Sequence, residues 1–140
     1  MDKDNQIVTK TKAFASRIIK LYKFLNNEKR EFIICKQILR SGTSIGANVR
    51  ESIYAQSKAD FINKMSIALK ESSETEYWLE LLFENEYLDE KAFKSIYDEN
   101  CQLTAMLASI VKSSKTPQNN IIFIFLFLIF YLKCIGLITL

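Results

Sequence analysis

Hydrophobic residues recur along most of the chain at the three- and four-residue spacing of amphipathic helices. In residues 10–26 the apolar stripe consists of Phe14, Ile18, Leu21, Tyr22 and Leu25. A second stripe, in residues 28–54, falls within an arc of roughly 100° at 3.6 residues per turn. Its members are Ile34, Ile38, Ile45, Val49 and Ile53. The first part of the chain therefore predicts two helices.

Two glycines lie inside or beside the second stripe, Gly42 and Gly46. Each costs a helix about 1 kcal/mol relative to Ala, so a packing reason is expected for both. Close approach of another helix is the simplest reason. The alternative is a break near residues 41–43, since the run Arg-Ser-Gly-Thr-Ser also suits a loop.

Two polar signals mark the starts of a third and a fourth helix. Ser57 and Asp60 form a capping-box pattern, which predicts a helix from there to about residue 85. Its main stripe is Phe61, Met65, Ala68, Leu69, Ser72, Leu79 and Phe83. Asp89 is the expected N-cap of the fourth helix. That helix has the stripe Phe93, Tyr97, Leu103, Leu107, Ile110 and Val111.

Four helices of similar length with short connections bury their stripes most simply in one arrangement. We expect an all-α fold, an antiparallel up-down-up-down four-helix bundle over residues 10–116. The chain contains only three Gly and one Pro, and Pro117 follows the last periodic segment, which favours long helices over strands and turns. Residues 1–9 are expected to be a flexible N-terminus.

Composition argues against an enzyme. The 140 residues include no histidine, so the usual general base and the commonest metal ligand are missing. No Gly-rich phosphate loop or nucleophile elbow is present. Cys35, Cys101 and Cys134 lack metal-ligand spacing, which predicts neither a zinc site nor a disulfide framework. With a charged N-terminus and no secretory signal pattern, we expect a cytoplasmic, non-catalytic protein without cofactors.

Charge is divided unevenly along the chain. Residues 1–64 contain 13 Lys/Arg and 6 Asp/Glu, a net charge of +7, whereas residues 65–116 contain 5 and 10, a net charge of −5. The first half either faces an acidic partner such as nucleic acid or complements the second half within the bundle or an oligomer. The candidate nucleic-acid contacts are Arg17, Lys20, Lys23, Lys36, Arg40 and Arg50.

The second predicted helix carries a polar stripe beside its apolar one. Its members are Gln37, Arg40, Ser41, Ser44, Asn48 and Glu51. Three readings stay open: a solvated face, a hydrogen-bonded seam against a neighbouring helix or subunit, and a ligand site. Ser and Asn are poor choices for an exposed helix interior, which is the argument for a seam.

The third predicted helix is apolar on two sides. Ile67, Trp78 and Leu81 lie off its main stripe, so they predict a second partner, which is either a neighbouring helix or another subunit, since Trp is enriched at interfaces. Glu71 and Glu74 lie beside them, three residues apart. Without a His or a nearby Asp to complete a di-metal set, they are not expected to bind metal.

Two stretches carry a family resemblance: residues 39–51, with the sequence LRSGTSIGANVRE, and residues 61–79, with IALKE, Glu74 and YWL. They resemble the 23S rRNA intervening-sequence proteins, bacterial four-helix bundles related to the accessory protein of diversity-generating retroelements. The resemblance implies a non-enzymatic bundle that forms a ring-like homopentamer in some members. In the retroelement branch it also implies a basic protein that binds nucleic acid and a reverse transcriptase. The net charge of +2 over residues 1–116 departs from that basic branch.

The C-terminal tail, residues 117–140, stands apart from the bundle. Residues 121–132 are uninterrupted apolar positions, and Lys133 is the first charge after them. One interpretation is a membrane anchor, which would tether a helical scaffold to the inner membrane. A second is an out-of-frame or read-through extension of AT-rich DNA, and a third is a buried or aggregation-prone strand. The main functional hypothesis remains an oligomeric adaptor that binds RNA or an RNA-associated protein.

Overall fold

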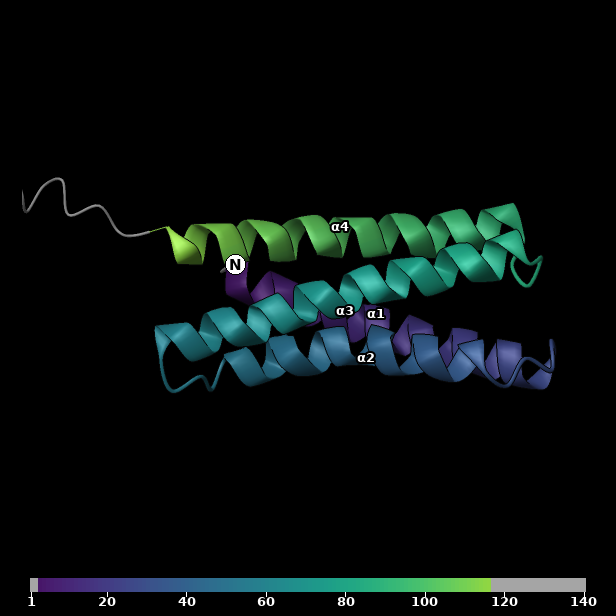
Figure 1. The fold of residues 1–140 in the computed structure, drawn as a ribbon, viewed down its shortest axis with the longest axis horizontal. Coiled ribbons are helices and arrows are strands. Elements are labelled where there is room, and N and C mark those ends of the chain that lie inside the picture. The colour runs from purple at the N-terminus through teal and green to yellow at the C-terminus, as the bar shows by residue number, and fades with distance from the viewer. Residues whose placement is uncertain (1–2, 117–140) are drawn as a thin grey trace, which may run out of the picture.

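The computed structural model describes residues 3–116, and within them every regular element is a helix: α1 (Lys3–Asn27), α2 (Ile34–Ser52), α3 (Lys58–Glu84) and α4 (Glu90–Lys115). The helices run antiparallel, each against its neighbour in sequence, and α1 also contacts α4, less extensively than it contacts α2 (Figure 1). The predicted all-α four-helix bundle is confirmed. The tail, residues 117–140, lies outside the described residues, so the structure tests none of the three interpretations of that segment.

Two of the predicted helix starts are capped by the expected side chains. The Ser57 Oγ atom accepts a hydrogen bond from the Asp60 backbone N–H at 3.1 Å, and the Asp60 carboxylate accepts in turn from the Gln56 N–H at 3.2 Å. The Asp89 carboxylate accepts from the Ala92 N–H at 2.7 Å. These contacts satisfy donors that the first helical turn leaves unpaired, which explains why α3 and α4 begin where they do.

The other two helices begin elsewhere than predicted. Residues 3–9, predicted to be a flexible N-terminus, are part of α1. Ile7 extends the α1 stripe by two turns and is only 1% exposed, so its burial favours the longer helix. The second helix begins at Ile34 instead of near residue 28, because the buried Glu31 carboxylate accepts hydrogen bonds from the N–H groups of Ile33, Ile34 and Cys35.

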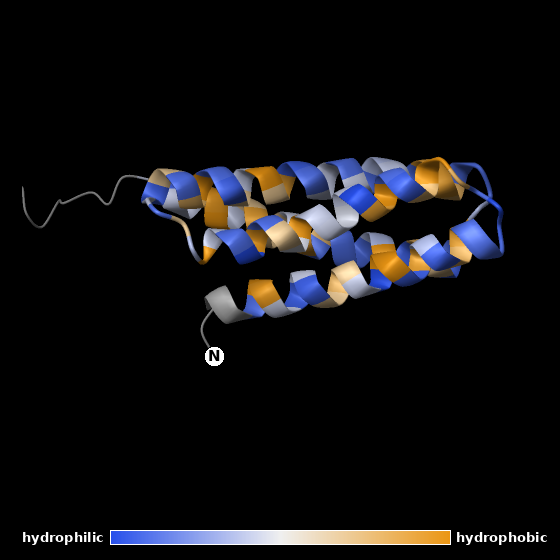
Figure 2. Cartoon of the chain, turned by 90° about the horizontal axis from the view of Figure 1, so that it is seen from below, coloured by the Kyte–Doolittle hydropathy of each residue, from blue (hydrophilic) through white to orange (hydrophobic). Residues whose placement is uncertain are grey.

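One hydrophobic core runs the length of the bundle, and hydrophobic residues alternate with hydrophilic ones along every helix (Figure 2). Many residues of the predicted apolar stripes lie in the core, and Phe14, Ile18, Ile38 and Leu107 are fully buried. Several predicted members lie at the edge, and Ile53 is 53% exposed. Buried positions outside the predicted stripes are Ile7, Thr11, Cys35, Ser52, Thr75, Leu82, Ile96 and Asn100.

The two glycines bring α1 and α2 together. A Cβ atom on Gly42 would lie 2.7 Å from Ile18 Cγ1, and one on Gly46 would lie 3.2 Å from the Thr11 carbonyl oxygen. The helix α2 continues unbroken through both positions. Close helix approach is therefore the reason for the glycines, and the alternative of a break at residues 41–43 is wrong.

Polar side chains cross the core between α3 and α4. The Oγ atoms of Ser72 and Thr104 are 2.7 Å apart, and the Asn100 Nδ2 atom donates to the Ser72 carbonyl at 3.0 Å. All three side chains are buried or half-buried. Because a buried polar group is costly unless it is paired, this layer favours one alignment of α3 against α4.

Candidate partner-binding surface

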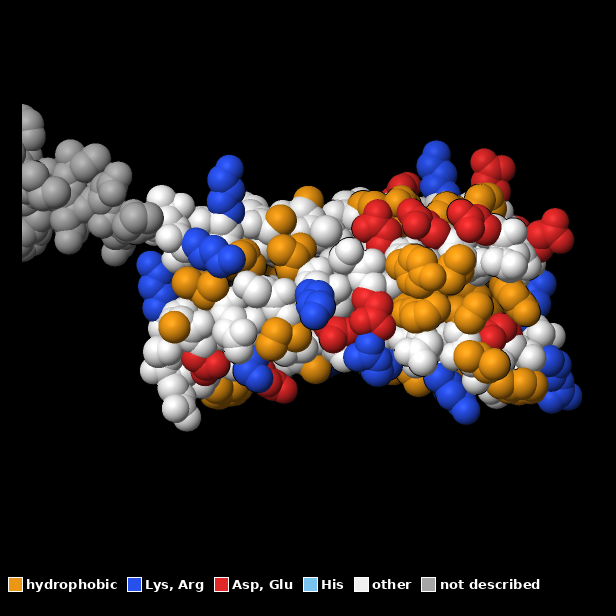
Figure 3. All heavy atoms as spheres, in the orientation of Figure 1, with side chains coloured by type: hydrophobic (Ala, Val, Ile, Leu, Met, Phe, Trp, Pro, Cys, Tyr) orange, Lys and Arg blue, Asp and Glu red, His pale blue; other side chains and the backbone are white. Residues whose placement is uncertain are grey.

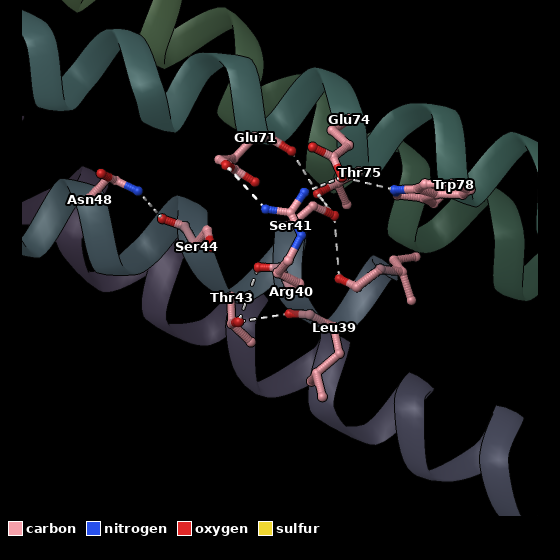
Figure 4. A network of polar contacts seen from close by, with 11 residues as sticks. Leu39, Arg40, Ser41, Thr43, Ser44, Asn48, Glu71, Glu74, Thr75 and Trp78 are labelled. Carbon is pink, nitrogen blue, oxygen red and sulfur yellow. Dashed lines mark hydrogen bonds and ion pairs between the residues drawn. The ribbon is translucent and has the colours of Figure 1, made fainter. Parts of the chain in front are cut away.

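The predicted polar stripe of α2 lies along α3, and its centre is a pair of hydroxyl groups. The Oγ atoms of Ser41 and Thr75 are 3.0 Å apart and fully buried. Directly beside this pair, the Arg40 guanidinium forms an ion pair with Glu74 and lies 3.7 Å from a Glu71 carboxylate oxygen (Figure 4). Near the end of α2, Glu51 binds Lys64 of α3 at 2.6 Å.

The remaining members of the stripe contribute less to this seam. Asn48 donates to the carbonyl of Ser44 within α2 at 2.9 Å, and Gln37 is half-buried. Of the six predicted residues, Arg40, Ser41 and Glu51 therefore contact α3. Their contacts join two helices of one bundle.

The ion pairs of the seam change the pKa of the groups that form them. A hydrogen bond from Arg40, joined by one from the Trp78 indole N–H at 3.2 Å, lowers the pKa of the Glu74 carboxyl below its usual range. The same Glu74 carboxylate, and then Glu71, raise the pKa of Arg40. Both groups thus stay ionised at neutral pH, which suits electrostatic contact and removes them as proton donors or acceptors.

The off-stripe residues of α3 are partly accessible. Ile67, Trp78 and Leu81 are each half-buried, and Tyr77, next to Trp78, is 53% exposed. The Tyr77 and Trp78 rings meet edge to face with centroids 4.9 Å apart. Figure 3 shows a patch of hydrophobic side chains on this face, over the half of the bundle that holds the α3–α4 connection.

Acidic side chains border this patch toward α4. The Tyr97 hydroxyl lies 2.8 Å from the Glu76 carboxylate and 3.1 Å from that of Glu80, and these hydrogen bonds raise the pKa of Tyr97. The Phe93 ring stacks on Phe83 with centroids 4.3 Å apart. Figure 3 shows acidic groups along that edge. Exposed apolar patches bordered by polar groups are typical of protein interaction surfaces, so this patch is a candidate for one.

The basic residues proposed to contact nucleic acid lie on different sides of the bundle. Arg17 pairs with Glu99 of α4, and Lys20 lines the hollow between α1 and α4. Arg50 lines a hollow of about 360 Å³ on the α1/α2 side together with Lys12. Arg40 belongs to the α2/α3 seam, while Lys23 and Lys36 are exposed. The sequence periodicity did not predict that these basic residues lie on different sides of the bundle. It shows which residues share a helix face, but it does not show which neighbouring helix that face contacts.

Residues 3–116 contain no cluster of three Cys, Asp or Glu side chains placed to hold a metal ion. Burial raises the pKa of the Cys35 and Cys101 thiols, and raised pKa values oppose thiolate chemistry. In the same range no helix has the length and apolar character needed to cross a membrane.

These features define a four-helix bundle with an internal polar seam and an exposed apolar patch. The chain belongs to the 23S rRNA-intervening sequence protein family, whose model matches residues 3–109. It is similar to the crystal structure of a protein of unknown function from the S23 ribosomal protein family of Bacteroides thetaiotaomicron. The two are 57% identical with a TM-score of 0.78, and the match covers 79% of this chain and 99% of the other. Among curated proteins, none matches this chain.

Proposed function

We propose that this bundle is a non-catalytic adaptor that associates with copies of itself. The observation that carries the proposal is the apolar patch on α3 around Tyr77, Trp78 and Leu81, with its acidic edge. Aromatic residues are enriched at the centres of protein interfaces, and a patch bordered by charge has the anatomy of one. The family resemblance adds the expectation of a ring, a homopentamer in some members.

Light scattering on the purified full-length chain tests this proposal. Tyr77→Glu should lower the molar mass toward that of a monomer, because it places a charge at the centre of the contact. Trp78→Glu should act likewise, although Trp78 also packs against the core, so Tyr77→Glu is the variant that separates association from folding. Tyr54→Glu is the matched control, since Tyr54 is 77% exposed in the connection before α3.

RNA, or a protein bound to RNA, is the second candidate partner. The observation that favours it is the α1/α2 side, where residues 6–27 contain no Asp or Glu and where Lys12 and Arg50 line one hollow. Phosphate contacts from these cations would make binding salt-dependent and poor in sequence preference. Lys12→Glu with Arg50→Glu should then weaken retention of RNA and flatten the dependence of affinity on salt. Wild-type protein that retains no RNA at low salt contradicts this candidate.

The alternative of a membrane-tethered scaffold rests entirely on residues 117–140. It predicts recovery of the full-length chain in the membrane fraction, and loss of that recovery after truncation at residue 116.

A further inference from the structure

The bundle is open along one side, between α1 and α4. A hollow of about 590 Å³ lies there, and its walls come from Arg17–Phe24 of α1 and from the start of α4. On the other side the wall is formed by Ala92 and Ile96, which are one turn apart on α4, and by Leu88 of the connection before α4. On α1 it is formed by Leu21 and Phe24, and the Phe24 side chain is 40% exposed.

The two sides of α1 are packed unequally. Gly42 and Gly46 bring α2 so close to α1 that a Cβ atom on Gly42 has no room, whereas α1 packs less extensively against α4. In Figure 1, α1 lies behind α2 and α3, and α4 runs along the top of the view. On the α4 wall, Ala92 and Ser95 are small and exposed, so they do not fill the space.

Charge on the rim of this groove is mainly positive. Lys20 and Lys91 are exposed on opposite walls. Arg17, at one end, is held by Glu99 and by the Ser95 hydroxyl at 3.0 Å. The acidic residue of the lining, Asp89, is engaged in capping α4 through the Ala92 N–H. The groove therefore suits an apolar ridge with acidic flanks.

Such a ridge exists on the same chain, on the outer face of α3. Tyr77 and Leu81 are one turn apart, and the exposed carboxylates of Glu80 and Glu84 lie on the same face at helical spacing. The helices α1 and α3 sit at opposite corners of the bundle, because neither packs against the other. The ridge of one molecule cannot reach its own groove, but it can reach that of a second copy.

We infer that the α1/α4 groove of one copy receives the α3 ridge of the next, with Lys20 and Lys91 facing Glu80 and Glu84. This inference rests on the proposed self-association and names its second surface. The contact joins two different surfaces, so it repeats from copy to copy and forms a ring where the rotation closes. Nucleic acid is the competing occupant, but the apolar floor of the groove offers nothing to phosphates, whereas it matches Tyr77 and Leu81.

Charge exchange on the full-length chain tests the pairing, with molar mass from light scattering and helicity from circular dichroism. Lys20→Glu with Lys91→Glu should lower the mass toward that of a monomer, and Glu80→Lys with Glu84→Lys should do the same. A chain with all four substitutions should regain the wild-type mass, since opposite charges face each other again. Lys58→Glu with Lys112→Glu is the matched control and should keep the wild-type mass, since both lysines are exposed at the end of the bundle away from the groove.

Three results would overturn the inference. If Tyr77→Glu lowers the mass but Lys20→Glu with Lys91→Glu does not, the ridge binds elsewhere, and the proposed adaptor function stands without this groove. A fourfold variant that remains dissociated would exclude the charge pairing. Loss of wild-type mass after nuclease treatment would mean that nucleic acid, and not the groove and ridge contact, joins the copies. A wild-type chain that is monomeric would remove the proposed function as well.

Discussion

The helix pairs α1/α2 and α3/α4 are each held together by different contacts. The helices α1 and α2 meet through glycines, with Ile18 packed on Gly42, and together they carry a net charge of +7. The helices α3 and α4 meet through the Ser72, Thr104 and Asn100 layer and through stacked aromatic rings, and together they carry −2. In the basic half, α1 and α2 are thus held by close approach of their backbones. In the acidic half, α3 and α4 are held by contacts between side chains.

The outer surfaces of the two pairs differ as well. The helix α1 packs closely on α2 and less extensively on α4, where the groove lies. In the other half, larger aromatic side chains fill the space between helices and extend to the surface, where Tyr77 and Phe83 are exposed. The comparison teaches that a four-helix bundle has distinct outer surfaces, here a groove and an exposed aromatic patch, when its helix pairs are packed unequally.

The largest loss of stability is expected when the polar layer of Ser72, Asn100 and Thr104 in the acidic half is disrupted. Asn100→Ala takes away a fully buried side chain and its hydrogen bond to the Ser72 carbonyl. The expected loss is about 3 kcal/mol of unfolding free energy. Urea denaturation measures it, and Gln102→Ala, at an exposed position of α4, should stay within about 0.5 kcal/mol of wild type. A similar loss for both variants would contradict a specific role for the layer.

The start of α2 should be the most pH-sensitive point of the basic half. Burial favours the neutral form of the Glu31 carboxyl, but three backbone N–H hydrogen bonds outweigh it and lower the pKa of Glu31. Glu31→Gln should cost about 2 kcal/mol at pH 7. Because the folded-state pKa is the lower one, this difference is complete above about pH 5 and closes as the pH falls through the folded-state pKa.

The matched control for that experiment is Glu28→Gln, at an exposed position in the same connection. Thermal or urea denaturation of both variants across pH 3 to 7, roughly the range in which carboxyl groups titrate, should show a pH-dependent difference for Glu31→Gln alone. A pH-independent difference would mean that Glu31 acts through packing.

The glycine contact should respond to a single methyl group. Gly42→Ala places Cβ 2.7 Å from Ile18, which is fully buried and cannot move aside. The clash should outweigh the gain in helix propensity, for a net loss of about 1–2 kcal/mol. Gly46→Ala meets the Thr11 carbonyl oxygen at 3.2 Å and should have a smaller effect. If Gly42→Ala stabilises the protein, α1 and α2 are not held by this contact.

The smallest expected effects are gains in stability at the two connections. Glu86 has φ of 62° and follows α3, with the Tyr87 N–H donating to the Leu82 carbonyl at 2.9 Å, the pattern of a helix end that favours glycine. Glu86→Gly should stabilise by about 0.5–1 kcal/mol. Arg30 has φ of 54° between α1 and α2, and Arg30→Gly should give a similar gain in stability. A rise in the melting temperature of each variant would confirm the prediction. A fall would mean that the backbone is not strained at that residue.

Much of this architecture was predictable from spacing and caps. Helical periodicity indicated four helices, and Ser57 and Asp89 mark the starts of two of them. The early start of α1 was missed, because Ile7 and Thr11 are too few to form a visible stripe. Asn100 was missed as a core residue because its burial depends on a partner carbonyl in another helix, which periodicity does not show.

The candidate surfaces were harder to predict. The polar stripe of α2 was recognised, but its partner was not, since Thr75 and Glu74 come from another helix. The basic residues were expected on one surface and lie on several, because Arg17 turns toward α4 and Arg40 toward α3. The α1/α4 groove has no signal in the sequence, because its walls come from two segments that lie far apart along the chain.

Self-association through α3 is the central claim, and the molar mass of Tyr77→Glu tests it most directly. Size-exclusion chromatography with light scattering should give an oligomeric mass for the full-length wild type and for Tyr54→Glu. Tyr77→Glu should give a mass close to that of the 16.3 kDa chain, with an unchanged helical circular dichroism spectrum. A folded Tyr77→Glu variant that keeps the wild-type mass would contradict the claim.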